Sequence, residues 1–208
     1  MQSTSSTVPS GRVRTRRAYF DCRFGQLHVR TAFPTTGGFD EGVTLVCLHP
    51  ERASSRSFVQ FLPEIANDRS VYAPDLPGCG ESDAAPSGGY AEAAAAIIDL
   101  AADLRLRRID VLGLKFGAGV ALELGAARPD LVRRLVLVGA PPLEQMPVIQ
   151  LESLVLQRKP VTQETAQSTR KILPRAKIVD LDGYTADLLE VVPKTLAKQI
   201  GEFLAAKT

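Results

Sequence analysis

One lysine occupies a position where the sequence pattern is typical of a serine nucleophile. Residues 108–119 read RIDVLGLKFGAG, an apolar run followed by a glycine-rich turn. Gly113, Lys115 and Gly117 have the spacing of the motif G-x-S-x-G, in which a reactive serine stands on a tight turn between a strand and a helix. Here an amine replaces the hydroxyl, so the sequence keeps the framework of a nucleophile and changes the reactive group.

Three roles are open to Lys115. A helix N-terminus disfavours added positive charge, and partial burial also disfavours the charged form of an amine. Both effects are expected to favour the neutral form of Lys115. A neutral amine at this position can form a Schiff base with a carbonyl substrate or act as a base. A charged amine can instead hold a carboxylate or phosphate together with the backbone N–H of Phe116. In the third role the side chain reaches into solvent from a site without chemistry.

The elements around this turn predict an α/β protein. Residues 18–33 have the pattern of an antiparallel hairpin that turns at Gly25. Buried strands are expected at residues 43–48, 71–75, 108–114, 135–138, 151–156 and 176–181. Helices are expected at residues 54–65, 90–106, 116–127, 162–173 and 188–204, the last interrupted at Pro193. Because continuous apolar strands alternate with helices, we expect a mostly parallel, doubly wound sheet with helices on both faces.

Length and composition favour one ordinary globular domain. The 208 residues are enough for one hydrophobic core. Residues 1–16 are rich in Ser, Thr and Arg, and we expect a disordered basic arm ahead of a single domain at residues 17–208. The composition of this arm also fits an organelle transit peptide.

The bulk properties exclude several classes of function. A net charge of +2 makes no case for nucleic acid as a partner. No apolar run approaches the roughly 18 residues that span a membrane. The three cysteines lack metal or redox spacing, and an odd count without a signal peptide favours the cytoplasm. We expect no metal and no cofactor.

Four motifs, in order, resemble those of the α/β-hydrolase family. They are His49-Pro50 after the first buried strand, DLPGCGES at residues 75–82, the turn at residues 113–117, and RRLVLV at residues 133–138. The resemblance extends from about residue 17 to about residue 204, and it implies the α/β-hydrolase fold. Members of this family often insert a lid where this chain has only residues 140–150, so a lidless core is expected.

The resemblance also implies that the catalytic triad is absent. Members use a serine, an acid and a histidine in that chain order. Lys115 stands at the serine position, Ala186 at the histidine position, and residues 156–162 contain no carboxylate where the acid is expected. Both histidines of the chain, His28 and His49, precede the elbow turn. We therefore expect a homologue without triad chemistry that binds a small carboxylate or carbonyl ligand, or a partner.

Other residues near the predicted site have alternative roles. His49 is expected to bond nearby backbone, with acid–base catalysis as the alternative. The resemblance also implies that the backbone N–H of Glu51 or of Arg52 lies where the family builds its oxyanion hole. Asp75 is expected to cap its own turn or to pair with Lys115.

The rival hypothesis is an enzyme that uses Lys115 as nucleophile, base or oxyanion stabiliser. Its substrate is a small carbonyl or ester compound, and Tyr184 or Asp187 is the partner of the lysine. A lidless apolar rim would also suit a homodimer.

Overall fold

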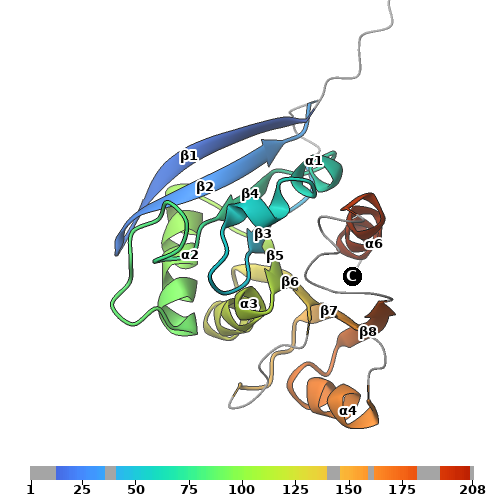
Figure 1. Cartoon of the computed structure of the whole chain (residues 1–208). Helices are drawn as coiled ribbons and strands as arrows, with labels where there is room; N and C mark the ends of the chain where they lie inside the picture. Colours follow the sequence, from blue (N-terminus) through green and yellow to red (C-terminus); the bar gives the residue numbers. More distant parts are fainter. Residues whose placement is uncertain (1–12, 36–40, 140–145, 159–161, 182–192, 207–208) are drawn as a thin grey trace, which may run out of the picture.

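The computed structural model describes residues 13–35, 41–139, 146–158, 162–181 and 193–206. Eight strands form one sheet in the order β1-β2-β4-β3-β5-β6-β7-β8 (Figure 1). Strand β2 pairs antiparallel with both of its neighbours, and every other pair is parallel. The expected α/β class and mostly parallel sheet are therefore confirmed.

The strands lie close to the positions that the apolar runs predict. They are β1 (Arg14–Cys22), β2 (Gly25–Phe33), β3 (Thr44–Leu48), β4 (Val71–Pro74), β5 (Ile109–Leu114), β6 (Val132–Val138), β7 (Glu152–Arg158) and β8 (Ala176–Leu181). Residues 139–151 alone connect β6 to β7, which leaves no room for a lid domain between them.

Strand β1 begins earlier than the sequence suggested. Residues 14–16 were assigned to the basic arm, but Arg14 pairs with Phe33 and Arg16 with Thr31. The arginines are exposed, so their charge does not oppose membership of an edge strand, and the backbone gains hydrogen bonds to β2. The arm boundary at residue 16 was therefore wrong, and residues 1–12 lie outside the described parts of the chain.

The helices pack on two sides of the sheet. They are the short 3₁₀ helix η1 (Ser55–Phe58), α1 (Leu62–Ile65), α2 (Tyr90–Asp103), α3 (Phe116–Ala127), α4 (Gln163–Ile172) and α6 (Pro193–Ala205). Helices α1 and α6 share one hydrophobic cluster with the sheet, and α2 and α3 share another, as their placement in Figure 1 shows. None of the helices in the described ranges is long and apolar enough to cross a membrane.

The segment predicted as one helix at residues 54–65 is instead two short helices. The Ser54 hydroxyl accepts a hydrogen bond from Arg56 N and begins η1. Pro63 lies at the start of α1. Proline lacks the N–H that a continuous helix would need and its ring opposes the preceding turn, so a new helix starts there.

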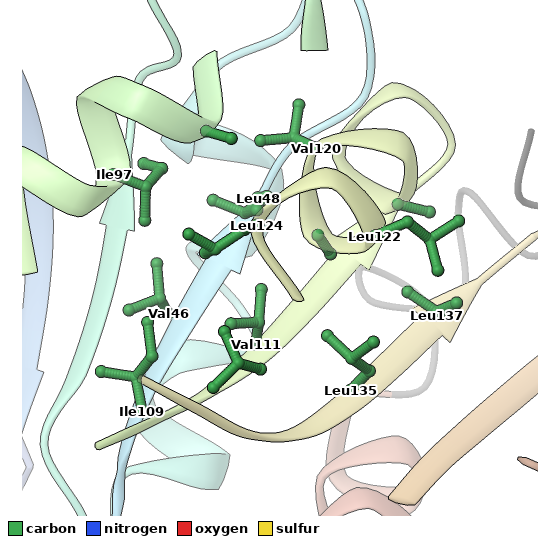
Figure 2. Close-up of a cluster of buried hydrophobic side chains, with 14 of the residues drawn as sticks. Val46, Leu48, Ile97, Ile109, Val111, Val120, Leu122, Leu124, Leu135 and Leu137 are labelled. Atoms are coloured by element: carbon green, nitrogen blue, oxygen red, sulfur yellow. The ribbon is translucent and has the colours of Figure 1, made fainter. Parts of the chain in front are cut away.

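Strand side chains alternate between the two hydrophobic clusters. In β3, Leu45 and Cys47 contribute to the cluster under α1 and α6, whereas Val46 and Leu48 contribute to the cluster under α2 and α3. Figure 2 shows the second cluster, with Val46 and Leu48 near side chains of neighbouring strands and helices. Because both faces are buried, each parallel strand appears in the sequence as an unbroken apolar run.

Two consecutive arginines of β6 hold the end of helix α6. Arg134, 2% exposed, donates hydrogen bonds to the carbonyl oxygens of Phe203, Leu204 and Ala206 at 2.8–2.9 Å. Arg133 donates to Leu204 O at 2.7 Å. These bonds satisfy carbonyls that a helix C-terminus leaves without internal partners, so the last helix is fixed to the centre of the sheet.

We predict that Arg134→Met lowers the free energy of unfolding by about 3 kcal/mol, because it removes a buried cation from its partner Glu152 and from the carbonyls at the end of α6. The measurement is urea denaturation followed by circular dichroism. Arg128→Met is the matched control, since Arg128 pairs with Asp130 on the exposed surface and little change is expected there. Equal losses in the two variants would contradict the anchoring role.

Candidate functional site

The predicted elbow is present between β5 and α3. Lys115 lies between the two elements with φ 48° and ψ −107°, a backbone conformation that residues other than glycine rarely adopt. Its N–H donates to Val138 O at 3.2 Å, and its carbonyl accepts from Ala118 N at 2.9 Å. Such backbone strain costs about 1–3 kcal/mol and persists only where the surroundings enforce it.

The two elbow glycines are required because backbone segments approach each other closely. A Cβ at Gly113 would collide with the Gly117 carbonyl, and a Cβ at Gly117 would collide with the Leu48 carbonyl at the end of β3. Helix α3 therefore sits directly against the ends of two strands. The spacing of Gly113 and Gly117 in the sequence therefore indicates this backbone contact. It does not determine which residue occupies position 115.

Lys115 presents its side chain to solvent. The residue is exposed, and its ammonium makes no hydrogen bond or ion pair with other described residues. In particular Asp75, its predicted partner, bonds to other groups. Tyr184, Ala186 and Asp187 lie outside the described residues, so their predicted roles stay predictions.

A cavity of about 210 Å³ opens beside the elbow, and we call it the elbow pocket. Its apolar wall is formed by Leu76, Pro77 and Phe116, and its rim includes Glu51 and Arg52. Phe116 and Glu51 were predicted for the site. Arg52 was considered with Glu51 only for its backbone N–H, because nothing in the sequence shows that the loop after β3 brings the Arg52 side chain to the pocket.

Cys79 also lines the elbow pocket, and the sequence did not indicate it. It follows Gly78 in the turn after β4, whose motif predicted a turn but not the direction of its side chains. Burial raises the pKa of the Cys79 thiol. The thiol form is a poor nucleophile, so Cys79 shapes the pocket and offers little reactivity.

Phe116 is held in place by a second aromatic ring. Its ring centroid lies 4.8 Å from that of Tyr90, at the start of α2. The same Tyr90 ring occupies the space that a Cβ at Gly119 would need. The wall of the elbow pocket is thus built from the first turns of two helices.

His49 joins two loops through both of its ring nitrogens. Nδ1 lies 2.7 Å from Pro50 O, and Nε2 accepts a hydrogen bond from Leu76 N at 2.8 Å. Nδ1 therefore carries the ring hydrogen. The side chain is fully buried, and burial lowers the pKa of His49. This arrangement suits the structural role, and it leaves the neutral ring no free nitrogen for proton transfer.

Asp75 organises the turn after β4. Its Oδ1 accepts from Ser55 N at 2.6 Å, and its Oδ2 accepts from Glu81 N at 2.9 Å. Burial by itself would raise the pKa of Asp75, but the backbone N–H groups outweigh it and the net pKa is lowered. Of the two roles considered for Asp75, the bond to Glu81 N corresponds to turn capping.

His28 is the partner of Asp75 that sequence reasoning missed. Its Nδ1 lies 3.0 Å from Asp75 Oδ2, and both side chains are 2% exposed. The contact arises because β2 pairs antiparallel with β4, with Val29 opposite Pro74. That long-range pairing is the only signal that would have placed a hairpin histidine next to this carboxylate.

A comparison with known families identifies the fold. Residues 43–181 match the sequence model of the alpha/beta hydrolase fold. The chain belongs to the α/β-hydrolase fold family. Within the described residues, no three His, Cys, Asp or Glu side chains gather as they would to hold a metal ion.

Two of the curated relatives are named as a deacetylase and a hydrolase, and both are longer than this chain. The pyrrolizixenacetamide deacetylase of Xenorhabdus hominickii is 30% identical over 151 residues, which cover 72% of this chain and 54% of that protein. The 2-hydroxymuconate semialdehyde hydrolase of Pseudomonas sp. (strain CF600) is 37% identical over 84 residues, 38% of this chain and 29% of that protein. The chain thus spans about half or less of the length of the relatives it matches.

Solved structures agree with this fold over nearly the whole chain. A putative hydrolase from Bacillus subtilis superposes with a TM-score of 0.78 at 15% identity, covering 92% of each chain. A predicted CIB-like hydrolase from Thermoplasma acidophilum gives a TM-score of 0.76 at 18% identity, covering 92% of this chain and 98% of that one. At such low identity the likeness establishes the fold alone.

The elbow contact leads to a prediction on stability. Gly117→Ala should lower the free energy of unfolding by at least about 2 kcal/mol, since the new methyl group collides with the Leu48 carbonyl. Gly201→Ala in α6 is the control, because its Cβ would meet Ile65 at an ordinary 3.7 Å and alanine is the better helix former. Chemical denaturation of both variants tests this, and a harmless Gly117→Ala would refute the close approach.

The bonding of Asp75 predicts a dependence of stability on pH. A lowered folded-state pKa stabilises the protein above the ordinary value of 3.8, and this contribution disappears as the pH falls through the folded-state pKa. The difference in unfolding free energy between wild type and Asp75→Asn should therefore be steady from neutral pH to about pH 5 and shrink below about pH 4. Denaturation curves across this range provide the measurement.

Asp103→Asn is the control for the loss of one carboxylate, since Asp103 is an exposed residue of α2. A difference between wild type and Asp75→Asn that stays constant down to pH 2 would contradict the assigned role of the Asp75 carboxylate.

Proposed function

We propose that this chain is an α/β-hydrolase-fold protein that does not use a Ser-His-Asp triad and that binds a small carboxylate or carbonyl compound in the elbow pocket. The proposal rests above all on the state of the two histidines in the sequence. His49 bonds backbone groups through both nitrogens, and His28 is paired with Asp75. Neither is among the residues that line the elbow pocket.

Ester or amide hydrolysis by the triad needs a base that removes the proton of the nucleophile and returns it to the leaving group. An amine at the apex does not replace a nucleophile and its base, because no acid, phenol or imidazole among the described residues is hydrogen-bonded to Lys115. The retained elbow backbone therefore supports binding more directly than it supports acyl transfer.

The elbow pocket has the character of a small-molecule site. Apolar side chains form its wall, while Arg52 and Glu51 supply charge at one side. Lys115 is not among the lining residues, but it directly precedes Phe116 of this wall and its exposed side chain adds a cation beside the pocket. Such a mixture suits a ligand with an apolar body and one polar end, and the volume of about 210 Å³ limits the ligand to a small one.

The curated relatives support this class of ligand. Their names describe a deacetylase and a semialdehyde hydrolase, both of which act on carbonyl compounds. A chain that keeps the fold but not the triad would hold a related carbonyl or carboxylate compound without cleaving it.

A second candidate function is supported by the strain at Lys115. The apex keeps a positive φ although the residue is not glycine, and such strain is concentrated at functional sites. An enzyme that attacks a carbonyl carbon with the Lys115 amine, releasing water as an imine forms, would need this presentation. The two functions share one residue and differ in whether the compound is altered.

The test exposes wild type, Lys115→Ala and Lys198→Ala to an extract of small bacterial metabolites and follows the compounds by mass spectrometry. We expect a carboxylate or carbonyl compound to be retained intact by wild type and by Lys198→Ala. Lys115→Ala should retain it at least tenfold more weakly, the size of effect expected from losing one charged contact. Lys198 is an exposed lysine of α6 and controls for charge.

Three other outcomes would overturn the binding function. A compound consumed only by proteins that carry Lys115 would establish the lysine-dependent enzyme. Ester hydrolysis that is lost in Lys115→Ala would show acyl transfer at the elbow. Identical behaviour of all three proteins would remove Lys115 from the site and favour a protein partner.

A further inference from the structure

A second cavity, of about 380 Å³, lies on the other side of the loop that follows β3. We call it the arginine pocket, because Arg30, Arg52 and Arg56 line it together with His28. Arg52 also borders the elbow pocket, but neither Lys115 nor Phe116 lines this second cavity. It is therefore a separate site that the proposed function does not use.

Buried polar atoms without partners are concentrated in this cavity. Among the described residues, His28 Nε2, Arg30 Nε and Ser55 Oγ are buried and make no hydrogen bond, and all three residues line the arginine pocket. His28 is 2% exposed and Ser55 1%. An unbonded buried polar group costs about 1–3 kcal/mol, so a polar ligand that bonds several of these atoms would be favoured in this cavity.

Positive charge also gathers around this cavity. Arg30 of β2 lines it, and Arg17 of β1 lies directly opposite Arg30 in the strand register, on the same face of the hairpin. Like charges opposite each other destabilise a sheet. Neither forms an ion pair within the described structure, and Arg56 reaches the cavity from η1 on the other side.

The acidic groups of the cavity are already engaged. Asp75 accepts two backbone N–H groups as well as facing His28 Nδ1. Glu81 is bound by the Tyr19 hydroxyl at 2.7 Å. These two carboxylates do not pair with the arginines. Arg52 pairs with Glu51 at 3.9 Å, so the guanidinium groups of Arg30 and Arg56 stay available to a ligand.

His28 also presents an unbonded ring nitrogen at this cavity. Because the Asp75 carboxylate accepts at Nδ1, that nitrogen carries the hydrogen of the His28 ring. The unbonded Nε2 is a donor when both ring nitrogens carry a hydrogen, and it is then free to bond a ligand oxygen.

We propose that the arginine pocket is a binding site for a small oxyanion, a phosphate ester or a carboxylate, held by the guanidinium of Arg30 and the imidazole of His28 with Arg56 opposite. Arginine forks match both groups geometrically. The site needs no reaction at the elbow, so it stands whether or not the elbow pocket binds its own ligand.

The test is calorimetric titration of the whole chain with inorganic phosphate and, separately, with acetate. Ionic strength is held constant with sodium chloride, because salt screens exposed arginines. Saturable binding of phosphate indicates a phosphate ester as the natural ligand, and preferential binding of acetate indicates a carboxylate. Absence of saturable binding of both probes would overturn the proposal.

Variants on both walls locate the binding. Arg30→Met and Arg56→Met should each weaken it about tenfold or more, as expected from the loss of a charge-assisted hydrogen bond. Arg14→Met, an exposed arginine of the same hairpin, should leave it unchanged. An equal loss in Arg14→Met would overturn the proposal, because it would reduce the effect to overall charge.

Lys115→Ala separates this site from the proposed function. Phosphate or acetate binding that survives Lys115→Ala and fails in Arg30→Met assigns the anion to the arginine pocket. Binding that fails in Lys115→Ala and survives in Arg30→Met would move the anion to the elbow and overturn the inference.

Discussion

The contact between the first turn of α3 and the ends of β3 and β5 controls the geometry of the loops that follow these parallel strands. At Gly113 and Gly117 the backbones leave no space for a side chain. Helix α3 therefore packs against Leu48 at the end of β3. The chain continues from there to His49, whose ring bonds Leu76 N in the turn after β4. The apex conformation at Lys115 follows from this packing and does not depend on the residue that occupies it.

Buried polar bonds extend this constraint to the neighbouring loops. His49 ties the loop after β3 to Leu76, and Asp75 ties the same loop to the turn at Glu81. Both histidines of the chain are thus part of the scaffold around the site. The loop after β3 carries Arg52, which borders two cavities of different character. The elbow pocket is mostly apolar, and the arginine pocket is cationic.

The sequence predicted those features that depend on local pattern. Unbroken apolar runs located the parallel strands because both sheet faces are buried, and the glycine spacing located the elbow. It did not predict contacts made by distant segments. The pairing of His28 with Asp75 requires the β2–β4 register, and the arginine pocket requires β2, η1 and the turn after β4 to meet.

The charge on the outer strands has a consequence for how copies of this chain meet. Strand β1 ends the sheet on one side with exposed Arg14, Arg16 and Arg17, and β8 ends it on the other with exposed Lys177 and Asp180. A second molecule that added its own β1 to this edge would bring two arginine rows together. Charged edge strands oppose such sheet extension. Pairing of two copies through their β1 strands is therefore disfavoured.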